Sequence, residues 1–498
     1  MGLTLLVILG LVSCLGPTSV DEETLDHLAE LLQSSSRDKR RSAVRRLAKL
    51  DSEEGWELVV SALADPEGLV ADEAEFRLAK LPAGSAVELL CGRAGLRSKD
   101  PQVAISAASV LGAFDGELDG ECLSKRLKDR DGGLRFALLS ALEDRARAGR
   151  LSGRRSRIVK STLAVASSGR EPWTRGSALV TAAVVAETDR DREDVARKLE
   201  RAAKDRDASS RIAALIASAS WGERKASKLM TTLSQDSAPS VRLQVLESAK
   251  ELANHDAARV LVKMLETETH ARVRWLLVGA LQQISGLLHR ADPRPWRDWL
   301  AGLPENWHGN TQQVRPRSGA ASSASLAGLP ILSDRIIFLV DFSGSLWTKR
   351  ADGTLRKAYA DVELRKALES LPDTAQFNLI PFTSVPHPWK PGLVRATRRN
   401  VSQAIEWFEA CTERGTGDFY EAALLALQDP EVDTILSFTD GLPTGGRRCR
   451  LDLMVPDLLR RARFRRIAFD TLLVDAPKRL HRHWQRLADE SGGQLVLE

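Results

Sequence analysis

A short pattern recurs along residues 22–303, about once every 29 to 40 residues. Each unit has a pair of marker residues in a helix-like stretch, and apolar residues come after them at spacings of three and four. The second marker is arginine in six of the eight units. A repeat of this length is typical of a solenoid, because one unit cannot bury its apolar face alone and neighbouring units must stack. The marker pairs are Arg40-Arg41, Leu69-Val70, Val103-Ala104, Leu134-Arg135, Thr174-Arg175, Ser210-Arg211, Val241-Arg242 and Val273-Arg274.

The residues between the markers indicate that two helices fill each period. Most marker helices come after a turn rich in Asp, Pro, Gly or Ser, such as Asp65–Gly68 and Asp131–Gly133. These residue types cap the start of a helix and interrupt the one before it. A second amphipathic stretch, such as Trp56–Val60, lies between successive markers. The sequence therefore predicts an all-α domain over residues 21–303.

The unit Asp236–Arg242, an acidic turn and then Val-Arg, resembles the HEAT-repeat family. The resemblance extends over residues 21–303 and implies a curved α-solenoid that serves as a scaffold or protein-binding surface. It also implies a structural role for the recurring arginine, which in that family bonds carbonyl groups or the acidic turn of a neighbouring repeat. A basic stripe that faces a partner is the alternative interpretation.

Periodicity is lost over residues 304–330, where small and polar residues dominate and Arg315–Ser325 contains proline and glycine. This composition predicts a flexible linker between two domains.

Apolar runs and helix-like stretches alternate over residues 331–498. The runs at 335–340, 377–382, 434–438 and 467–474 are nearly continuous, as in strands buried on both faces. Helices are expected at 355–371, 401–410 and 480–490, with an edge strand at 494–497. This order predicts a doubly wound, Rossmann-like α/β domain, whose ligands bind at the carboxyl ends of the strands.

Oxygen-bearing side chains gather at the carboxyl ends of two of these strands. The first strand ends in Asp341, Ser343 and Ser345, and the third ends at Asp440. Thr416 lies in a glycine-flanked loop between them. The set offers carboxylate and hydroxyl oxygens only, which suit Mg²⁺, Mn²⁺ or Ca²⁺ and disfavour zinc or copper. Mg²⁺ prefers six ligands and readily keeps water, so a position would remain for an outside carboxylate.

The Asp-x-Ser-x-Ser run, the loop threonine and the Asp-Gly after the central strand resemble the metal-ion-dependent adhesion site of the von Willebrand factor type A (VWA) family. The resemblance covers residues 331–498. It implies that Asp341, Ser343, Ser345, Thr416 and Asp440 hold one divalent cation, with Mg²⁺ first and Mn²⁺ or Ca²⁺ as alternatives. It also implies a protein partner that supplies a carboxylate to the ion, with no chemistry performed.

Further charged residues surround this motif. Asp418 is either a hydrogen-bond acceptor behind the metal ligands or the cap of the next helix, and the cap is the preferred interpretation. The arginine-rich loop after Asp440 either attracts an anionic partner or carries solvated charge, and the second is preferred; its arginines are Arg447, Arg448 and Arg450.

The N-terminal residues 1–20 are expected to form a signal peptide. Leu3–Val12 is an apolar run too short to span a bilayer. The run Leu11–Cys14 resembles the bacterial lipobox, which implies an N-terminal lipid on Cys14 and attachment to a membrane. The alternatives are plain signal cleavage and an apolar first helix. Export predicts a location in the periplasm, the cell envelope or outside the cell.

Export would also permit disulfides. Cys411 and Cys449 flank the metal-binding loops and could pair, although two separate buried thiols fit equally well. Cys91 and Cys122 are expected to be buried thiols in neighbouring repeats.

The leading hypothesis is an exported, non-enzymatic scaffold whose C-terminal domain binds an acidic partner through a divalent cation. A second hypothesis gives partner binding to the solenoid and makes the terminal domain a clip for assembly. A hydrolase is disfavoured because Ser343 lies in no Gly-x-Ser-x-Gly motif. A net charge of +5 gives no global basic field, which argues against nucleic acid as a partner.

Overall fold

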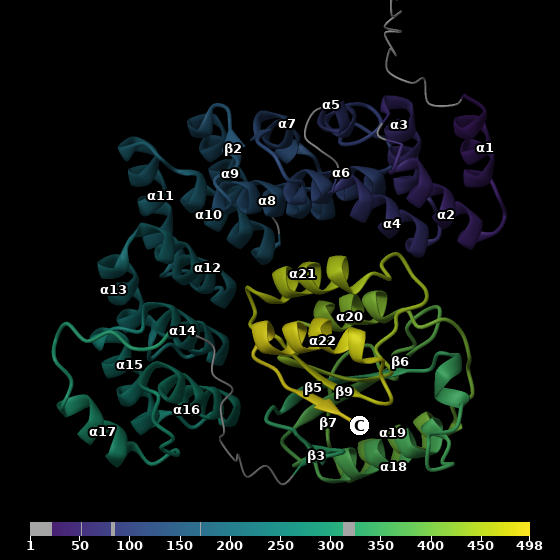
Figure 1. Ribbon diagram of the computed structural model, residues 1–498. Coiled ribbons are helices and arrows are strands. Elements are labelled where there is room, and N and C mark those ends of the chain that lie inside the picture. The colour runs from purple at the N-terminus through teal and green to yellow at the C-terminus, as the bar shows by residue number, and fades with distance from the viewer. Residues whose placement is uncertain (1–21, 51, 81–84, 170, 312–323) are drawn as a thin grey trace, which may run out of the picture.

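The computed structural model describes residues 22–50, 52–80, 85–169, 171–311 and 324–498. The N-terminal part is an arch of paired helices, and an α/β domain lies on its inner side (Figure 1). The expected signal peptide at 1–20, with Cys14, lies outside the described residues, as does part of the expected linker. Within the part of the chain that the structure describes, none of the helices has the length and apolar character needed to cross a bilayer.

The arch is an α-solenoid, as the repeat predicts. Its helices are α1 (Glu22–Leu32), α2 (Arg37–Leu47), α3 (Glu53–Ser61), α4 (Gly68–Leu78), α5 (Ser85–Cys91), α6 (Pro101–Ala113), α7 (Glu121–Ser124), α8 (Gly132–Arg147), α9 (Arg155–Ser168), α10 (Pro172–Val185), α11 (Asp189–Ala202), α12 (Ala208–Ser218), α13 (Glu223–Leu233), α14 (Pro239–Leu252), α15 (His255–Thr267), α16 (Ala271–Ser285) and α17 (Pro293–Ala301). A short parallel pair, β1 (Leu118–Asp119) and β2 (Leu151–Ser152), connects two turns.

The turns between repeats start the helices as their composition predicts. Asp131 caps α8 by accepting a hydrogen bond from the N–H of Leu134 at 2.7 Å. Asp100 caps α6 in the same way, and Pro101 occupies the first helical position, where a missing N–H costs nothing.

The recurring arginines join each repeat to the next, and we call these contacts the ladder. Arg211 forms a bidentate ion pair with Asp236 in the next turn, with both N–O distances 2.7 Å, and Arg242 pairs in the same way with Glu268. Arg274 donates instead to three backbone carbonyls. The structural interpretation is therefore correct for these arginines. In the first unit the other marker residue makes the contact: Arg40 pairs with Asp65 at 2.6 and 2.9 Å, and Arg41 pairs with Glu73. The ladder arginines are Arg135, Arg175, Arg211, Arg242 and Arg274.

The C-terminal domain is built on a six-stranded sheet of order β10-β9-β8-β5-β6-β7. All neighbouring strands are parallel except β7, which is antiparallel to β6. The strands are β5 (Arg335–Asp341), β6 (Gln376–Phe382), β7 (Val394–Arg395), β8 (Thr434–Thr439), β9 (Ala468–Leu473) and β10 (Leu495–Leu497).

Helices cover both faces of this sheet, so alternate residues of one strand enter different cores. Phe338 of β5 packs in the hydrophobic core on one face of the sheet, and its neighbour Leu339 packs in the core on the opposite face. The helices are α18 (Arg356–Glu369) and α19 (Arg398–Ala410) on the first face, and α20 (Phe419–Gln428), α21 (Leu451–Ala462) and α22 (Lys478–Ser491) on the second.

Part of the segment predicted as linker has regular structure. A hairpin of β3 (Ser325–Leu326) and β4 (Leu329–Pro330) packs on the domain, and the N–H of Ala327 donates to Glu363 of α18 at 3.0 Å. Leu326 and Leu329 are buried in the same core as α18. These apolar residues explain why the hairpin belongs to the domain.

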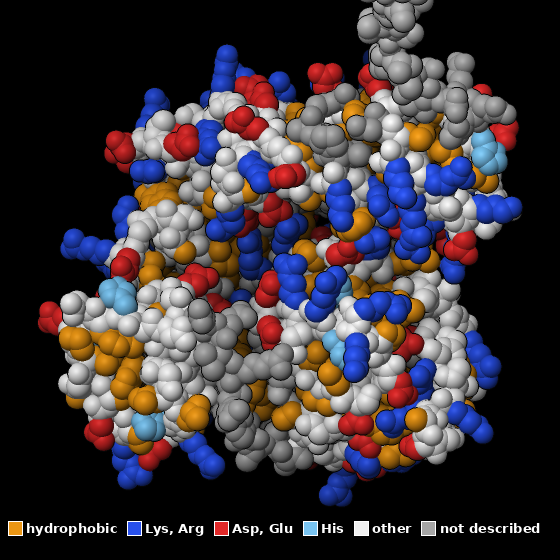
Figure 2. Space-filling model, viewed as in Figure 1, with side chains coloured by type: hydrophobic (Ala, Val, Ile, Leu, Met, Phe, Trp, Pro, Cys, Tyr) orange, Lys and Arg blue, Asp and Glu red, His pale blue; other side chains and the backbone are white. Residues whose placement is uncertain are grey.

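The α/β domain contacts the inner side of the arch, and we call this contact the seam. Lys and Arg side chains gather where the two parts meet (Figure 2). Phe464, just beyond α21, is buried in the hydrophobic core of the solenoid. The seam includes Asp72, Glu73, Glu75, Glu143, Asp144, Gly176, Glu247 and Arg272 of the solenoid, and Arg448, Arg450, Arg460, Arg463, Phe464 and Arg466 of the α/β domain.

Candidate metal site

The five oxygen-bearing residues of the sequence motif come from three neighbouring segments at one edge of the sheet. Asp341 is the last residue of β5, and Asp440 comes directly after β8, the adjacent strand. Because both strands are parallel, their carboxyl ends meet at this edge, which we call the rim. Thr416 reaches the rim from the loop before α20.

Asp341 is the buried centre of this group. Its carboxylate accepts hydrogen bonds from the N–H of Ser343 at 2.9 Å and from the hydroxyl of Thr439 at 2.7 Å. Burial raises the pKa of Asp341 to about 6, and the nearby Asp440 carboxylate adds to the rise. The buried carboxylate of Asp341 thus lies close to that of the half-buried Asp440, and a cation between them would offset both charges.

The two serines lie on a tight turn directly after Asp341. Their hydroxyl oxygens are 3.0 Å apart, so both face the same small region. The turn continues as a short 3₁₀ segment over Gly344–Trp347, which includes Ser345.

The threonine loop packs directly on this turn. The N–H of Gly344 donates to the carbonyl of Gly415 at 3.2 Å, and a side chain on Gly417 would come within 3.2 Å of a carboxylate oxygen of Asp341. Glycine at 417 therefore lets the loop backbone approach the aspartate closely. The hydroxyl of Thr416 lies next to that of Ser384, at 3.1 Å.

Asp418 caps the next helix, as preferred from the sequence. Its carboxylate accepts a hydrogen bond from the N–H of Glu421 in the first turn of α20, at 3.1 Å. Burial raises its pKa to about 6. Its backbone N–H donates to the carbonyl of Thr383 at 2.8 Å, which ties the threonine loop to the end of β6.

Three residues at the rim were missed by the sequence reasoning. Ser384 contacts Thr416, Thr439 contacts Asp341, and the hydroxyl of Thr444 accepts a hydrogen bond from the threonine loop at Gly417. Thr439 could have been suspected because it directly precedes Asp440. Ser384 and Thr444 carry no motif of their own.

The arginine-rich loop after Asp440 requires a correction. Neither the anionic-partner interpretation nor the solvated-charge interpretation fits Arg448, which is only 5% exposed. Its guanidinium pairs with Glu75 at 3.0 Å and with Asp72 at 3.4 Å, both in α4 of the solenoid. Arg447 remains exposed beside Glu421.

All four described cysteines are free in the structure. The thiol of Cys411 donates to the carbonyl of Trp407 at 3.3 Å, and that of Cys449 to the carbonyl of Gly445 at 3.2 Å. The disulfide considered for this pair is therefore not formed here. Cys91 and Cys122 are half-buried and contact each other.

A second group of potential metal ligands lies at the seam, before the strands begin. His270, Asp334 and Asp433 bring ligand atoms within 4.8 Å of one another. Asp433 already accepts a hydrogen bond from Thr434, and its backbone carbonyl accepts from the buried Arg272 at 2.9 Å. A guanidinium so close disfavours a bound cation, so we assign this group to the domain contact.

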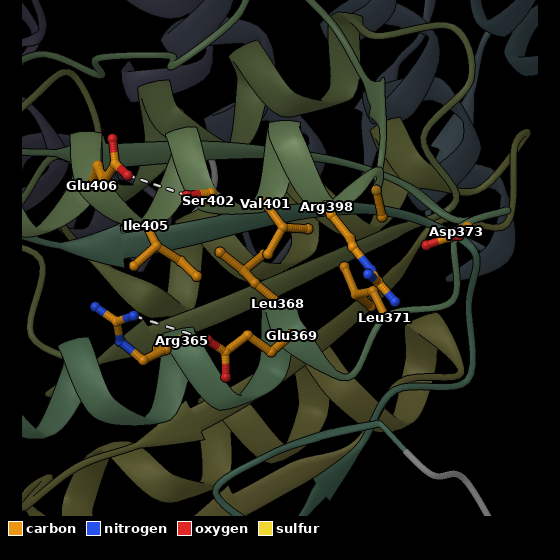
Figure 3. Close-up of a pocket in the computed structure, with 11 residues that line it drawn as sticks. Arg365, Leu368, Glu369, Leu371, Asp373, Arg398, Val401, Ser402, Ile405 and Glu406 are labelled. Atoms are coloured by element: carbon orange, nitrogen blue, oxygen red, sulfur yellow. Dashed lines mark hydrogen bonds and ion pairs between the residues drawn. The ribbon is translucent and has the colours of Figure 1, made fainter.

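A pocket of about 490 Å³ lies between α18 and α19 (Figure 3). Leu368 and Ile405 are among its apolar lining residues, and ion-paired or hydrogen-bonded side chains such as Arg365 and Glu369 border it (Figure 3). Leu371 and Asp373, which also line it, precede β6, so the pocket lies toward the edge of the sheet opposite the rim.

Comparison with known families finds both parts of the chain. Residues 195–282 match HEAT repeats, and residues 334–497 match the von Willebrand factor type A domain. Mouse inter alpha-trypsin inhibitor heavy chain 4 is 34% identical over 130 residues, and human inter-alpha-trypsin inhibitor heavy chain H4 is 31% identical over 131 residues. Each match covers 24% of this chain and only 13% of the relative.

Solved structures with some likeness include the Ro protein of Deinococcus radiodurans, at 14% identity and a TM-score of 0.23, covering 95% of this chain and 90% of that chain. An aerotolerance-related membrane protein from Bacteroides fragilis has 13% identity and a TM-score of 0.25, covering 33% and 90%. Scores this low carry no argument. The family matches show that the N-terminal part contains HEAT repeats and that the C-terminal domain belongs to the von Willebrand factor type A family.

Proposed function

We propose that the VWA domain holds one divalent cation, Mg²⁺ before Mn²⁺ or Ca²⁺, at the rim and binds a carboxylate of a protein partner through it. The residues that would hold the ion are Asp341, Ser343, Ser345, Thr416 and Asp440. The observation that supports the proposal is that the turn after β5, which carries Asp341, Ser343 and Ser345, packs against the loop of Thr416 beside the end of β8, where Asp440 follows.

The donor set fits a hard cation. It consists of carboxylate and hydroxyl oxygens, which are the ligands of Mg²⁺ and Ca²⁺. Asp341 is buried beside the charge of Asp440, and a divalent ion would offset both charges where water cannot. When bound, the ion would supply an electrophilic site for an incoming carboxylate oxygen. The hydroxyls of Ser343 and Ser345 would supply two further ligands. The hydroxyl of Thr416 is held by its contact with the hydroxyl of Ser384.

The wider role rests on the family. VWA domains and these relatives support a non-enzymatic role in protein interaction. We further propose an exported scaffold, on the basis of the apolar run at Leu3–Val12. An N-terminal lipid at Cys14 would attach it to a membrane.

The assembly-scaffold alternative gives partner binding to the solenoid. The seam makes this less favourable, because part of the inner side of the arch already contacts the chain's own VWA domain through Glu143 and Asp144. The hydrolase alternative is weaker, since Ser343 lies in no Gly-x-Ser-x-Gly motif and its hydroxyl contacts the hydroxyl of Ser345.

Isothermal titration with Mg²⁺ tests the cation site. We expect a single binding site in the full chain and its loss in the double variant Asp341→Ala, Asp440→Ala. Asp352→Ala is the matched control, because Asp352 is an exposed acid of the same domain. Unchanged binding in the double variant would show that the cation site lies elsewhere. A wild type that binds no Mg²⁺ would contradict the proposal outright.

Partner binding needs its own test. Capture from a native extract with immobilised wild-type chain, with Mg²⁺ or with a chelator, should retain a protein only when the ion is present. The same protein should not be retained by the double variant. A partner that stays bound in chelator and to the double variant would point to the solenoid surface.

A further inference from the structure

One loop connects the rim to the solenoid. It runs from Gly441, directly after Asp440, to Arg450, directly before α21, and we call it the bridging loop. Its residue Thr444 contacts the threonine loop of the VWA domain, and its last residues are fixed to α4, more than 370 residues earlier in the chain. Contacts at both ends are specific and close.

At the rim, the bridging loop clamps the threonine loop. The hydroxyl of Thr444 accepts a hydrogen bond from the N–H of Gly417 at 3.0 Å, and the N–H of Thr444 donates to the carbonyl of Gly417 at 3.1 Å. A side chain on Gly445 would lie 2.1 Å from the hydroxyl of Thr416, so the loop backbone is pressed against that residue. The position of Thr416 therefore depends on where the bridging loop lies.

At the solenoid, Asp72 holds the other end. One oxygen of its carboxylate accepts hydrogen bonds from the N–H groups of Cys449 at 2.6 Å and Arg450 at 2.9 Å. Asp72 is only 2% exposed and also contacts Arg448. Two backbone N–H groups bound to one buried carboxylate fix the course of the loop, as distinct from merely attracting its charge.

Shape adds to these bonds. Gly68, the first residue of α4, packs so closely on the bridging loop that a side chain there would come within 2.2 Å of the carbonyl oxygen of Gly446. Gly441 and Gly446 lack a Cβ and give a free loop many backbone conformations, whereas in the docked loop both have a positive φ angle; docking on α4 therefore selects one conformation.

We propose that Asp72 of the solenoid is a positioning residue of the cation site in the VWA domain, and that docking of the bridging loop on α4 raises the affinity of that site. The inference rests on the proposed function. Docking pre-organises Thr416 and the segment after Asp440, so the bound ion meets ligands that are already in place. The coupling is reciprocal: the ion must strengthen docking by the factor by which docking strengthens ion binding.

The first test compares two acids of the seam by Mg²⁺ titration of the full chain. Asp72→Ala removes the anchor of the bridging loop, and Asp144→Ala removes a seam ion pair with Arg460 that does not involve the loop. We expect about 10-fold weaker Mg²⁺ binding for Asp72→Ala and less than about 2-fold change for Asp144→Ala. Equal affinities in the wild type and Asp72→Ala would overturn the inference.

A second pair of variants avoids removing charge. Gly68→Val inserts a side chain between α4 and the bridging loop, and Gly176→Val inserts one against Phe464 elsewhere in the seam, where a side-chain carbon would come within 2.9 Å of the ring. Both should loosen the seam, but only Gly68→Val should weaken Mg²⁺ binding. Equal weakening by both would mean that general loosening acts, and that Asp72 has no positioning role.

Hydrogen exchange separates this inference from the proposed function. Mg²⁺ should slow exchange of the Cys449 and Arg450 amides in the wild type and not in the variant Asp341→Ala, Asp440→Ala. A wild type that binds no Mg²⁺ contradicts the proposed function itself. A wild type that binds Mg²⁺ without slower exchange at these amides contradicts only the coupling.

Discussion

The ladder and the seam both join arginine to acidic side chains, but they differ in separation and burial. Ladder partners such as Arg211 and Asp236 are 25 residues apart, and the contact recurs from repeat to repeat. Arg448 of the seam meets Asp72 across 376 residues, in one copy. The ladder pair keeps some exposure, at 12% and 8%, whereas the side chains of the seam pair are 6% and 3% exposed.

Because of this difference, losing one contact should affect stability less in the ladder than in the seam. A contact that is repeated can lose one member while its neighbours still hold the stack, since each repeat interacts only with the next. The contact of Arg448 with Asp72 and Glu75 does not recur along the seam, and removing one partner leaves the other charged and without water. The ladder therefore stiffens the arch in small steps, whereas the seam decides whether two domains act together.

Arg448→Ala should have the largest effect. It leaves Asp72 and Glu75 buried without their cation, and we expect a loss of about 3–5 kcal/mol in the free energy of unfolding. Chemical denaturation monitored by tryptophan fluorescence measures it, with domain separation expected as an early transition.

The control for Arg448→Ala removes the acids as well. Combining Arg448→Met with Asp72→Asn and Glu75→Leu removes the buried charges, while the amide oxygen of the asparagine can still accept hydrogen bonds from the N–H groups of Cys449 and Arg450. This triple variant should recover most of the loss. A loss below about 1 kcal/mol for Arg448→Ala alone would place this pair with ordinary exposed ion pairs and remove the distinction from the ladder.

The next largest effect is expected at Asp470, which lies near Arg272 at the other end of the seam, and it concerns how stability depends on pH. Burial raises its pKa to about 7, although the Arg272 guanidinium and a hydrogen bond from the N–H of Gln494 oppose the rise. The native state thus keeps a proton that the unfolded chain releases near pH 4, about the ordinary value for aspartate. Between these values unfolding releases a proton, so the contribution of Asp470 to stability is fully present below about pH 4 and is lost as pH rises through 7.

Asp470→Asn should remove this dependence. From about pH 5 to pH 7 the wild type should lose about 2–3 kcal/mol more of its free energy of unfolding than the variant does. Asp373→Asn, at an exposed acid, is the control and should behave like the wild type. Parallel curves for wild type and Asp470→Asn would show that this carboxyl does not titrate in the expected range.

Features that recur, and features set by strand order, could be predicted from the sequence. The ladder arginines repeat, and Asp341 and Asp440 end adjacent parallel strands, so their meeting at the rim could be foreseen. The contact between Arg448 and Asp72 could not, because a single pair separated by several hundred residues leaves no periodic signal. Helix α21 was missed because Pro456 interrupts its pattern, although the helix continues through it.

Arg211→Ala should have the smallest effect and sharpens the comparison from the side of the ladder. It removes the pair with Asp236 and the bonds to the carbonyls of Asp205 and Arg206, while solvent can still reach the freed groups. We expect a loss of about 1–2 kcal/mol in the free energy of unfolding. Mg²⁺ affinity should not change, since Arg211 makes no contact with the bridging loop among the described residues. Lys at this position should recover only part of the loss, because a single ammonium cannot replace the bidentate geometry. A loss as large as that of Arg448→Ala would mean that one broken ladder pair disrupts the whole arch, and the contrast between recurring and single contacts would then be wrong.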